Sequence, residues 1–436
     1  MISLRNKSEF GKNVLTLFTG QVLSQGIPII IAPLLARIYS PADFGVADVV
    51  MAIVSIIASV ACGNYEQAIL LPEDNKKGFL IAGAATILCS IVSGTVLLIV
   101  VLFRPILSSF VGLDSQSSYY LFFVPVIVWL VSLFMVLRYY NLRSQHYRLI
   151  AKAMTIKSIF LTGVQLLVGI LKASPLGLLV GQLSSNVFSN KALLKTVKNH
   201  WKMYSNEISR TSILSLAIEY INFPKFSVPG TLANTLVLYL PSVFISKVFS
   251  LQLLGFIALT NRILNVPLNV IASAVGDAFM QKLSRLTNDT KSGRGFFLRI
   301  FGILSLVSAV AYIFGVFLLK PLIVFVFGNN WEYAGELGGI MLPLFAIRFI
   351  CIPLSKVLIV FQKQRLFLYL TSVQLLILVS TFLVTYLAKL SFEGYFRVYI
   401  YAQFIFYCFY LFICFWVVNH KSRMKNNENL KNYKID

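Results

Sequence analysis

Charged side chains lie inside the apolar stretches of this sequence, and they are the residues best suited to chemistry there. Arg262 follows Asn261 in the run FIALTNRILNVPLNV, and Arg348 stands in a later apolar run. A charged group at the centre of a bilayer costs about 2.5–3.5 kcal/mol on insertion scales, so it usually faces a partner or a water-filled cavity. A guanidinium binds phosphate or carboxylate through two parallel hydrogen bonds. The two arginines therefore indicate a site for an anionic ligand.

Further polar residues stand in other apolar runs. Asp48 and Asp277 are each placed to pair with a cation or to titrate, and Lys356 shares a helix face with Arg348, eight residues earlier. Gln25 belongs to a polar group in the first run that lipid would not tolerate on an outer face. The alternative for each charge is an intramembrane salt bridge or a side chain that reaches the interface. We expect the substrate to contact Arg262, Arg348, Asn261 and Gln25, and ion coupling or charge pairing to involve Asp48, Asp277 and Lys356.

The elements that position these residues must be membrane-spanning helices. The chain has 436 residues, of which 58% are hydrophobic and 12% charged, whereas about 25% of the residues of a soluble protein are charged. A helix that crosses the bilayer needs about 20 mainly apolar residues. Twelve runs qualify, at 12–36, 43–62, 78–102, 119–140, 157–172, 175–194, 228–248, 254–279, 296–319, 336–360, 366–388 and 397–418. These runs predict an all-α membrane protein of about twelve spans.

The basic residues predict the orientation of these spans. The connections on the side of the two termini hold 28 of the 38 Lys and Arg residues, and the opposite connections hold six. Basic residues concentrate in cytoplasmic connections. We therefore expect both termini to be cytoplasmic. The basic residues that give the net charge of +22 then face anionic headgroups. No basic block is long enough to form a nucleic-acid-binding surface.

A short internal repeat indicates two halves. RIYSPADFGV (37–46) and KVFSLQLLGF (247–256) each place a basic residue, a bulky pair and a serine before an apolar stretch with Gly45 or Gly255. Both lie at the outer junction between the first and second predicted spans of a half. Two six-helix halves with a substrate site between them are a common transporter plan.

The longest inner connection lies between these halves and contains an amphipathic stretch. Its apolar residues recur at helical spacing, which predicts a helix in the headgroup region; they are Ile213, Leu216, Ala217, Tyr220 and Ile221. We expect an N-terminal lobe at 1–200, a cytoplasmic amphipathic linker at 201–227, and a C-terminal lobe with a basic tail at 228–436.

The sequence lacks the motifs of several enzyme classes. It has no G-x-x-x-x-G-K-[ST] loop for nucleotide binding, and no acidic pair in a sizeable loop for a metal and a sugar nucleotide. The five cysteines show no C-x-x-C spacing and the three histidines are far apart, so we expect no metal and no cofactor. These features favour a transporter over an enzyme.

Three segments carry a resemblance to a known family. PLLARIYSPADFGVADVV (33–50), GNYEQAILLPEDNKK (63–77) and YYNLRSQHYRLIAKAMTIKS (139–158) are similar to bacterial polysaccharide-biosynthesis proteins, the Wzx-type flippases. That family belongs to the MOP superfamily, together with MATE exporters and the lipid II flippase MurJ. The resemblance implies two six-helix lobes around a central cavity lined by spans 1, 2, 7 and 8, which would place Asp48 and Arg262 on cavity-forming spans.

The resemblance also implies a substrate and partners. The substrate would be an undecaprenyl-pyrophosphate-linked O-antigen or capsule repeat unit, moved from the cytoplasmic to the periplasmic leaflet of the inner membrane. A polysaccharide polymerase and a chain-length regulator would be partners, besides membrane lipids. A MATE-type multidrug exporter is one alternative, although its cavity should be acidic. A membrane glycan polymerase is the other, although the outer connections are short.

Overall fold

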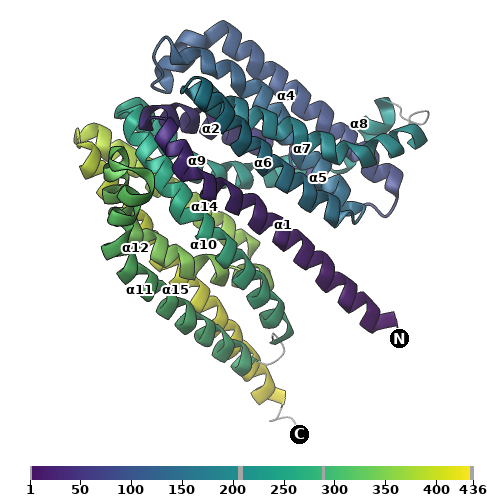
Figure 1. The fold of residues 1–436 in the computed structure, drawn as a ribbon. Helices are drawn as coiled ribbons and strands as arrows, with labels where there is room; N and C mark the ends of the chain where they lie inside the picture. Colours follow the sequence, from purple (N-terminus) through teal and green to yellow (C-terminus); the bar gives the residue numbers. More distant parts are fainter. Residues whose placement is uncertain (1, 205–209, 287–289, 433–436) are drawn as a thin grey trace. The chain divides into compact units, whose positions relative to one another are not determined.

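The chain is helical almost throughout, as the sequence predicts. The computed structural model describes residues 2–204, 210–286 and 290–432, and these ranges contain no strand. By its internal packing the chain divides into two compact units, Met1–Ala258 and Leu259–Asp436. Figure 1 labels most of their long helices.

The first unit consists of long helices joined by short connections. They are α1 (Ile2–Ile38), α2 (Pro41–Ala61), α3 (Tyr65–Ala68), α4 (Asn75–Phe110), η1 (Ser117–Phe122), α5 (Phe123–Arg143), α6 (Tyr147–Leu171), α7 (Pro175–Tyr204), α8 (Arg210–Glu219), η3 (Phe223–Ser227) and α9 (Val228–Val248). α6 packs between α1 and α7, while α2 packs against α5 and α9. α10 (Leu251–Leu286) begins in this unit and continues into the second.

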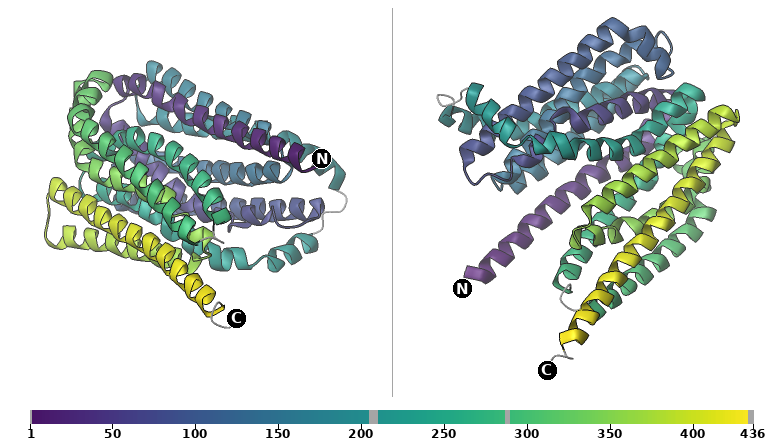
Figure 2. Two further views of the ribbon diagram at one scale, coloured as in Figure 1. Left: turned by 90° about the horizontal axis from the view of Figure 1, so that it is seen from below. Right: turned by 180° about the vertical axis from the view of Figure 1, so that it is seen from behind.

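A large apolar core joins the helices of the second unit. Its remaining helices are α11 (Thr290–Phe327), η4 (Asn329–Trp331), α12 (Glu332–Leu354), α13 (Val357–Val360), α14 (Gln364–Leu387) and α15 (Phe392–Asn432). α15, yellow in Figure 2, packs along α11, α12 and α14. Buried residues of α10, α11, α12, α14 and α15 share the core, among them Phe279, Phe297, Leu354 and Phe406.

Eleven helical segments of the described chain are long and apolar enough to cross a membrane. They coincide with eleven of the twelve predicted runs, and the missing one is the sixth, 175–194. A helix, α7, does occupy that run, and residues 172–174 separate it from α6. The fifth and sixth predicted runs are thus two distinct helices.

The polar residues of α7 explain why its mean hydropathy is too low for it to be counted among the membrane spans. Ser185, Asn186, Ser189 and Asn190 are all buried where α7 packs against α5 and α6. The Asn190 amide donates to the backbone carbonyl of Leu130 at 2.9 Å. Because this polar row contacts protein instead of lipid, α7 can span a membrane with a lower average hydropathy than its neighbours.

The amphipathic stretch in the long connection forms α8. Leu216 is buried, Ile213 and Ala217 are half-buried, and α8 packs against α4. The predicted apolar face is therefore the packed face. Ile221 departs from the prediction, because α8 ends at Glu219 and the Ile221 side chain is exposed. The preceding helix α7 extends to Tyr204, into the predicted linker, and residues 205–209 lie outside the described residues.

Candidate functional site

The two repeated decapeptides meet in the first unit, where α2 and α10 cross. A Cβ atom added to Gly45 would collide with the backbone carbonyl of Leu251, and one added to Gly255 would collide with that of Pro41. Leu251 precedes Gly255 by four residues, and Pro41 precedes Gly45 by four. The contact is therefore reciprocal, as a two-fold relationship between the repeats requires. Only glycine lets the two backbones approach this closely.

The serines of the two repeats also occupy equivalent places. The Ser40 hydroxyl accepts a hydrogen bond from the Asp43 backbone N–H, and the Asp43 carboxylate accepts from the Ser40 N–H, which completes a capping box at the start of α2. The Ser250 hydroxyl accepts from the Leu253 N–H at 3.1 Å at the start of α10. Both crossing helices thus begin at a capped serine, which fixes where each glycine meets the other helix.

Two of the predicted site residues belong to the first unit. Asp48 stands three residues after Gly45 on α2 and is half-buried. Its carboxylate lies near the hydroxyl of Ser242 of α9. Gln25 is half-buried on α1, three residues before Pro28, which lies inside the helix.

The other predicted residues belong to the second unit, and Arg348 has the best-defined surroundings. Its guanidinium lies 5.3 Å from the ring centroid of Phe345 and 5.9 Å from that of Tyr407. Tyr407 in turn accepts a hydrogen bond from the Gln374 amide at 3.3 Å. Such cation–π contacts stabilise a cation at a desolvated site without neutralising its charge.

No carboxylate of the second unit forms an ion pair with Arg348 within the described chain. Glu332 and Glu336 both bind Lys320, at 2.9 and 2.8 Å. Asp277 lies 3.9 Å from Lys356. Glu393 is exposed in the first turn of α15. The charge of Arg348 is therefore available to an anion from outside the chain.

Arg262 and Asn261 lie on α10, and both are half-buried. Asn261 accepts a hydrogen bond from the Asn265 amide at 3.2 Å, one turn further along. α10 continues through Pro267, two residues further along. Asn261, Arg262 and Asn265 thus form a polar stretch within one long helix.

Arg262 and Arg348 lie at different levels of the second unit. α10 and α12 run parallel, because Thr260 donates to the Ala334 carbonyl at 2.9 Å and Gly276 lies against Pro353. By these two contacts Arg348 is level with a part of α10 about ten residues beyond Arg262. At 1.5 Å per residue the backbone positions of the two arginines are roughly 15 Å apart along the helices.

Lys356 and Asp277 form the ion pair that the sequence offered as one of two readings. Their separation of 3.9 Å is long, and the side chains are 33% and 69% exposed. Exposed pairs of this kind contribute about 0–1 kcal/mol to stability. The pair is therefore a weak contact and leaves Asp277 accessible to water.

A second group of residues, which the sequence reasoning did not assign, ties the α2–α4 connection to its surroundings. Arg143 of α5 donates to the carbonyls of Ile69, Pro72 and Glu73. All four residues belong to segments quoted for the family resemblance. The arginine at the end of α5 was the available signal, since a guanidinium carries five N–H donors in a fixed fork and can serve several carbonyls at once.

The same connection also contacts α8 and the start of α9. The Asn64 amide donates to the Thr231 hydroxyl at 2.9 Å, and the Tyr65 hydroxyl donates to the Ala217 carbonyl at 2.7 Å. Asn64 adopts a left-handed conformation with φ of 57°, which asparagine tolerates better than most residues. These two bonds therefore hold α8 and the start of α9 against the α2–α4 connection.

Glu66 lies in this connection, in the short helix α3. Its side chain is buried, and its Oε2 atom has no hydrogen-bond partner among the described residues. Burial raises the pKa of the Glu66 carboxyl above its ordinary value, because desolvation disfavours the charged form. Within the described residues no group of three or more His, Cys, Asp or Glu side chains could hold a metal ion.

Known proteins confirm the resemblance that the three sequence segments carry. The family model described as "Polysaccharide biosynthesis protein" matches residues 34–336. No curated protein matches the chain in sequence.

The fold is shared with transporters of known structure. The chain resembles the lipid II flippase MurJ in an inward closed conformation, with 11% identity, a TM-score of 0.67, and 94% of this chain and 90% of that chain covered. It also resembles a MATE transporter from Vibrio cholerae, with 13% identity, a TM-score of 0.58, and 97% of each chain covered. An outward-facing MATE family transporter of the MOP superfamily shows 13% identity, a TM-score of 0.56, and coverage of 95% and 96%. At these identities the likeness concerns the fold, while the matched family model covers most of the sequence. The chain belongs to the polysaccharide biosynthesis protein family.

Proposed function

We propose that this chain is a flippase that moves an undecaprenyl-pyrophosphate-linked oligosaccharide, an O-antigen or capsule repeat unit, from the cytoplasmic to the periplasmic leaflet. The observation that carries the proposal is the Arg348 guanidinium, which sits on an apolar helix beside two aromatic rings and has no carboxylate partner in the described part of its unit. Arg348 is half-buried, and a cation that is partly removed from water without a counter-charge is costly. An anionic headgroup would supply that charge during each transport cycle.

We assign Arg262 and Arg348 different tasks, because their backbone positions are roughly 15 Å apart along the helices. One arginine would bind the pyrophosphate, and the other would meet an acidic or polar part of the oligosaccharide. Asn261 and Gln25 would donate hydrogen bonds to sugar hydroxyls. Asp48, half-buried on α2 near the Ser242 hydroxyl, would link the cycle to an ion gradient. The Asp277–Lys356 pair would exchange partners during the cycle.

The architecture proposed for transport has two six-helix lobes, 1–200 and 228–436, with a cytoplasmic linker at 201–227 and a cavity between the lobes. Alternating access would rock one lobe against the other. The crossing at Gly45 and Gly255 would then form a closed outer gate. The chain would lie in a bacterial inner membrane with both termini in the cytoplasm. A polymerase and a chain-length regulator would receive the product at the periplasmic leaflet.

Two other functions have weaker support. A multidrug exporter shares the fold, but an unpaired guanidinium would repel cationic drugs. A glycan polymerase generally needs a large outer loop, whereas the connections on the proposed outer side are short: residues 39–40, 172–174, 249–250 and 388–391 separate their helices.

The test measures surface glycan in cells that carry Arg348→Ala, Arg262→Ala or the control Arg397→Ala. Arg397 is an exposed arginine near the start of α15, so its loss should leave the glycan unchanged. The first two variants should abolish surface glycan at normal protein levels and leave repeat units on the cytoplasmic leaflet. Wild-type glycan in Arg348→Ala cells would refute the role of Arg348, and repeat units that reach the periplasmic leaflet without being polymerised would indicate a polymerase instead.

A further inference from the structure

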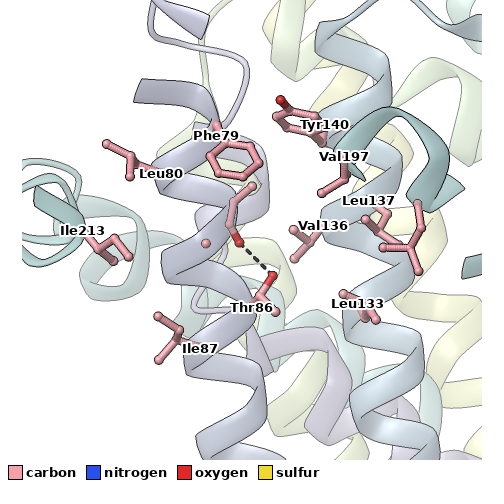
Figure 3. Close-up of a pocket in the computed structure, with 13 residues that line it drawn as sticks. Phe79, Leu80, Thr86, Ile87, Leu133, Val136, Leu137, Tyr140, Val197 and Ile213 are labelled. Atoms are coloured by element: carbon pink, nitrogen blue, oxygen red, sulfur yellow. Dashed lines mark hydrogen bonds between the residues drawn. The ribbon is translucent and has the colours of Figure 1, made fainter. Parts of the chain in front are cut away.

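An apolar cavity of about 290 Å³ lies in the first unit between α4, α5, α7 and α8. Figure 3 shows Phe79, Thr86 and Ile87 of α4 on one side, Leu133 and Leu137 of α5 on the other. The Thr86 hydroxyl bonds back to the Ala82 carbonyl at 2.8 Å within its own helix. The lining therefore offers hydrocarbon and almost no free polar group to an occupant.

The helix α8 contributes to this cavity from outside the bundle. Ile213 projects from α8 toward the α4 side in Figure 3. Tyr65, which lies in the α2–α4 connection, holds the other end of α8 through the Ala217 carbonyl. An occupant of the cavity would thus contact both the bundle and α8, the helix within the proposed linker.

A polar cavity of about 350 Å³ adjoins the apolar one. Tyr140 lines both, and the remaining lining of the polar cavity comes from Asn75, Arg143, Ser144, Gln145 and His146. The Tyr140 ring packs edge-on against Phe79, with centroids 6.0 Å apart, at the boundary between the two cavities. Arg143 brings a fixed positive charge, while Gln145 and His146 are exposed and can turn their donors toward an anion.

The surrounding helices reinforce this charge. α5, α6 and α7 contain no acidic residue over their full lengths. α7 carries the exposed Lys195 and Lys198 beside the cavity residues Leu194 and Val197. The acidic residues at the other edge are Glu73 and Asp74, which the adjoining Lys76 and Lys77 balance in number. A negatively charged headgroup is therefore favoured here.

We propose that the two cavities together bind one anionic glycerophospholipid, with its phosphate among Arg143, Gln145 and His146 and the end of one acyl chain between α4 and α5. Both volumes lie at the lower end of the range for small-molecule pockets, about 300–1,000 Å³. They fit a single phosphate and part of one chain better than a diphosphate with several sugars. The site is distinct from the residues proposed for transport, and on the proposed orientation it opens to the inner leaflet.

The bound lipid has a structural consequence. Because its chain would contact Ile213, the lipid would stabilise α8 against α4 without touching the residues proposed to bind substrate. Lipid composition would then alter the stability of the proposed linker.

The experiment uses the full chain, purified and returned to vesicles that contain phosphatidylglycerol with a photoactivatable group on its acyl chain. Cross-links should concentrate on residues 79–87 and 133–140. Gly83→Leu fills the cavity, since a Cβ there meets no atom within 4 Å. Exclusion of about two methylene groups should lower the cross-linking about tenfold.

Gly94→Leu is the matched control. Gly94 also lies on α4, also has no atom within 4 Å of an added Cβ, and does not line the cavity. It should leave the cross-linking unchanged, and thermal unfolding should show that both variants fold. Equal effects of the two substitutions, or cross-links spread evenly along the exposed side of α4, would overturn the proposal.

Two competitors identify the headgroup and the class of lipid. Unlabelled phosphatidylglycerol should displace the probe, and phosphatidylcholine should do so much less. Equal displacement by phosphatidylcholine would refute the anionic site. Stronger displacement by a polyprenyl phosphate would replace the phospholipid assignment with a prenyl lipid, whereas failure of the Arg262 and Arg348 tests would leave this site unaffected.

Discussion

Gly45 and Gly255 lie face to face where α2 and α10 cross, each placed so that a side chain would strike the backbone of the other helix. The repeat that contains them spans only ten residues and has few identities. The reciprocal contact, four residues before each glycine, shows what the repeat preserves: a backbone crossing, together with the serine that begins each helix.

Alanine at either crossing glycine should destabilise the protein. Gly45→Ala or Gly255→Ala places a Cβ against a carbonyl that cannot rotate away, so the helices must separate, at a cost of about 1–3 kcal/mol. The double variant should cost less than the two single variants combined, because one separation relieves both collisions. Thermal unfolding of the purified protein measures this, with Gly302→Ala as control because its added Cβ meets nothing. Additive effects would mean that the two glycines do not share one crossing.

Replacement of Arg143 by lysine should loosen the α2–α4 connection. A lysine carries its three donors on one nitrogen, whereas Arg143 donates to three carbonyls from two nitrogens of a planar fork. Each charge-assisted hydrogen bond contributes about 1.5–3 kcal/mol. Arg143→Lys should therefore increase hydrogen exchange of the backbone across residues 69–75. Arg148→Lys changes an exposed neighbouring arginine and serves as the control. Unchanged exchange in the Arg143 variant would show that these bonds do not hold the connection.

Glu66 should make the protein less stable as the pH rises. Its pKa in the folded chain is raised above the unfolded value of about 4.3, so the folded state binds more protons. The contribution to stability is fully present below the unfolded pKa and is lost as the pH rises through the folded pKa. Thermal unfolding of Glu66→Gln across this range should lack that decline. Glu73→Gln, at an exposed position in the same connection, should keep it, and an equal decline in both variants would assign it to another group.

A variant of Asp277 can distinguish a role in charge pairing from a role in ion coupling. Because the contact with Lys356 is long and exposed, Asp277→Asn should change the free energy of unfolding by less than about 1 kcal/mol. If Asp277 also couples an ion, the variant should alter the dependence of transport on the ion gradient at unchanged stability. Transport in reconstituted vesicles with and without a pH gradient measures this. A large loss of stability would show that the pair is structural.

Much of the architecture is determined by the sequence alone, because lipid imposes a simple rule on it. A segment that crosses hydrocarbon must be helical, long and mainly apolar, so eleven of the twelve predicted runs coincide with apolar helices of the structure. The sixth run shows the limit of that rule. Asn186 and Asn190 lower its hydropathy, yet both are buried against neighbouring helices, and no count along one segment can distinguish a polar residue that faces protein from one that faces lipid.

The partners of each polar residue were decided only by the tertiary structure. From spacing alone Arg348 and Lys356 share a helix face, but Lys356 meets Asp277 while Arg348 meets Phe345 and Tyr407. Arg143 and the carbonyls of Ile69 and Pro72 are about seventy residues apart in sequence. Hydropathy and charge act on each segment separately and can be read locally, whereas a hydrogen bond or a backbone crossing depends on two segments that only packing brings together.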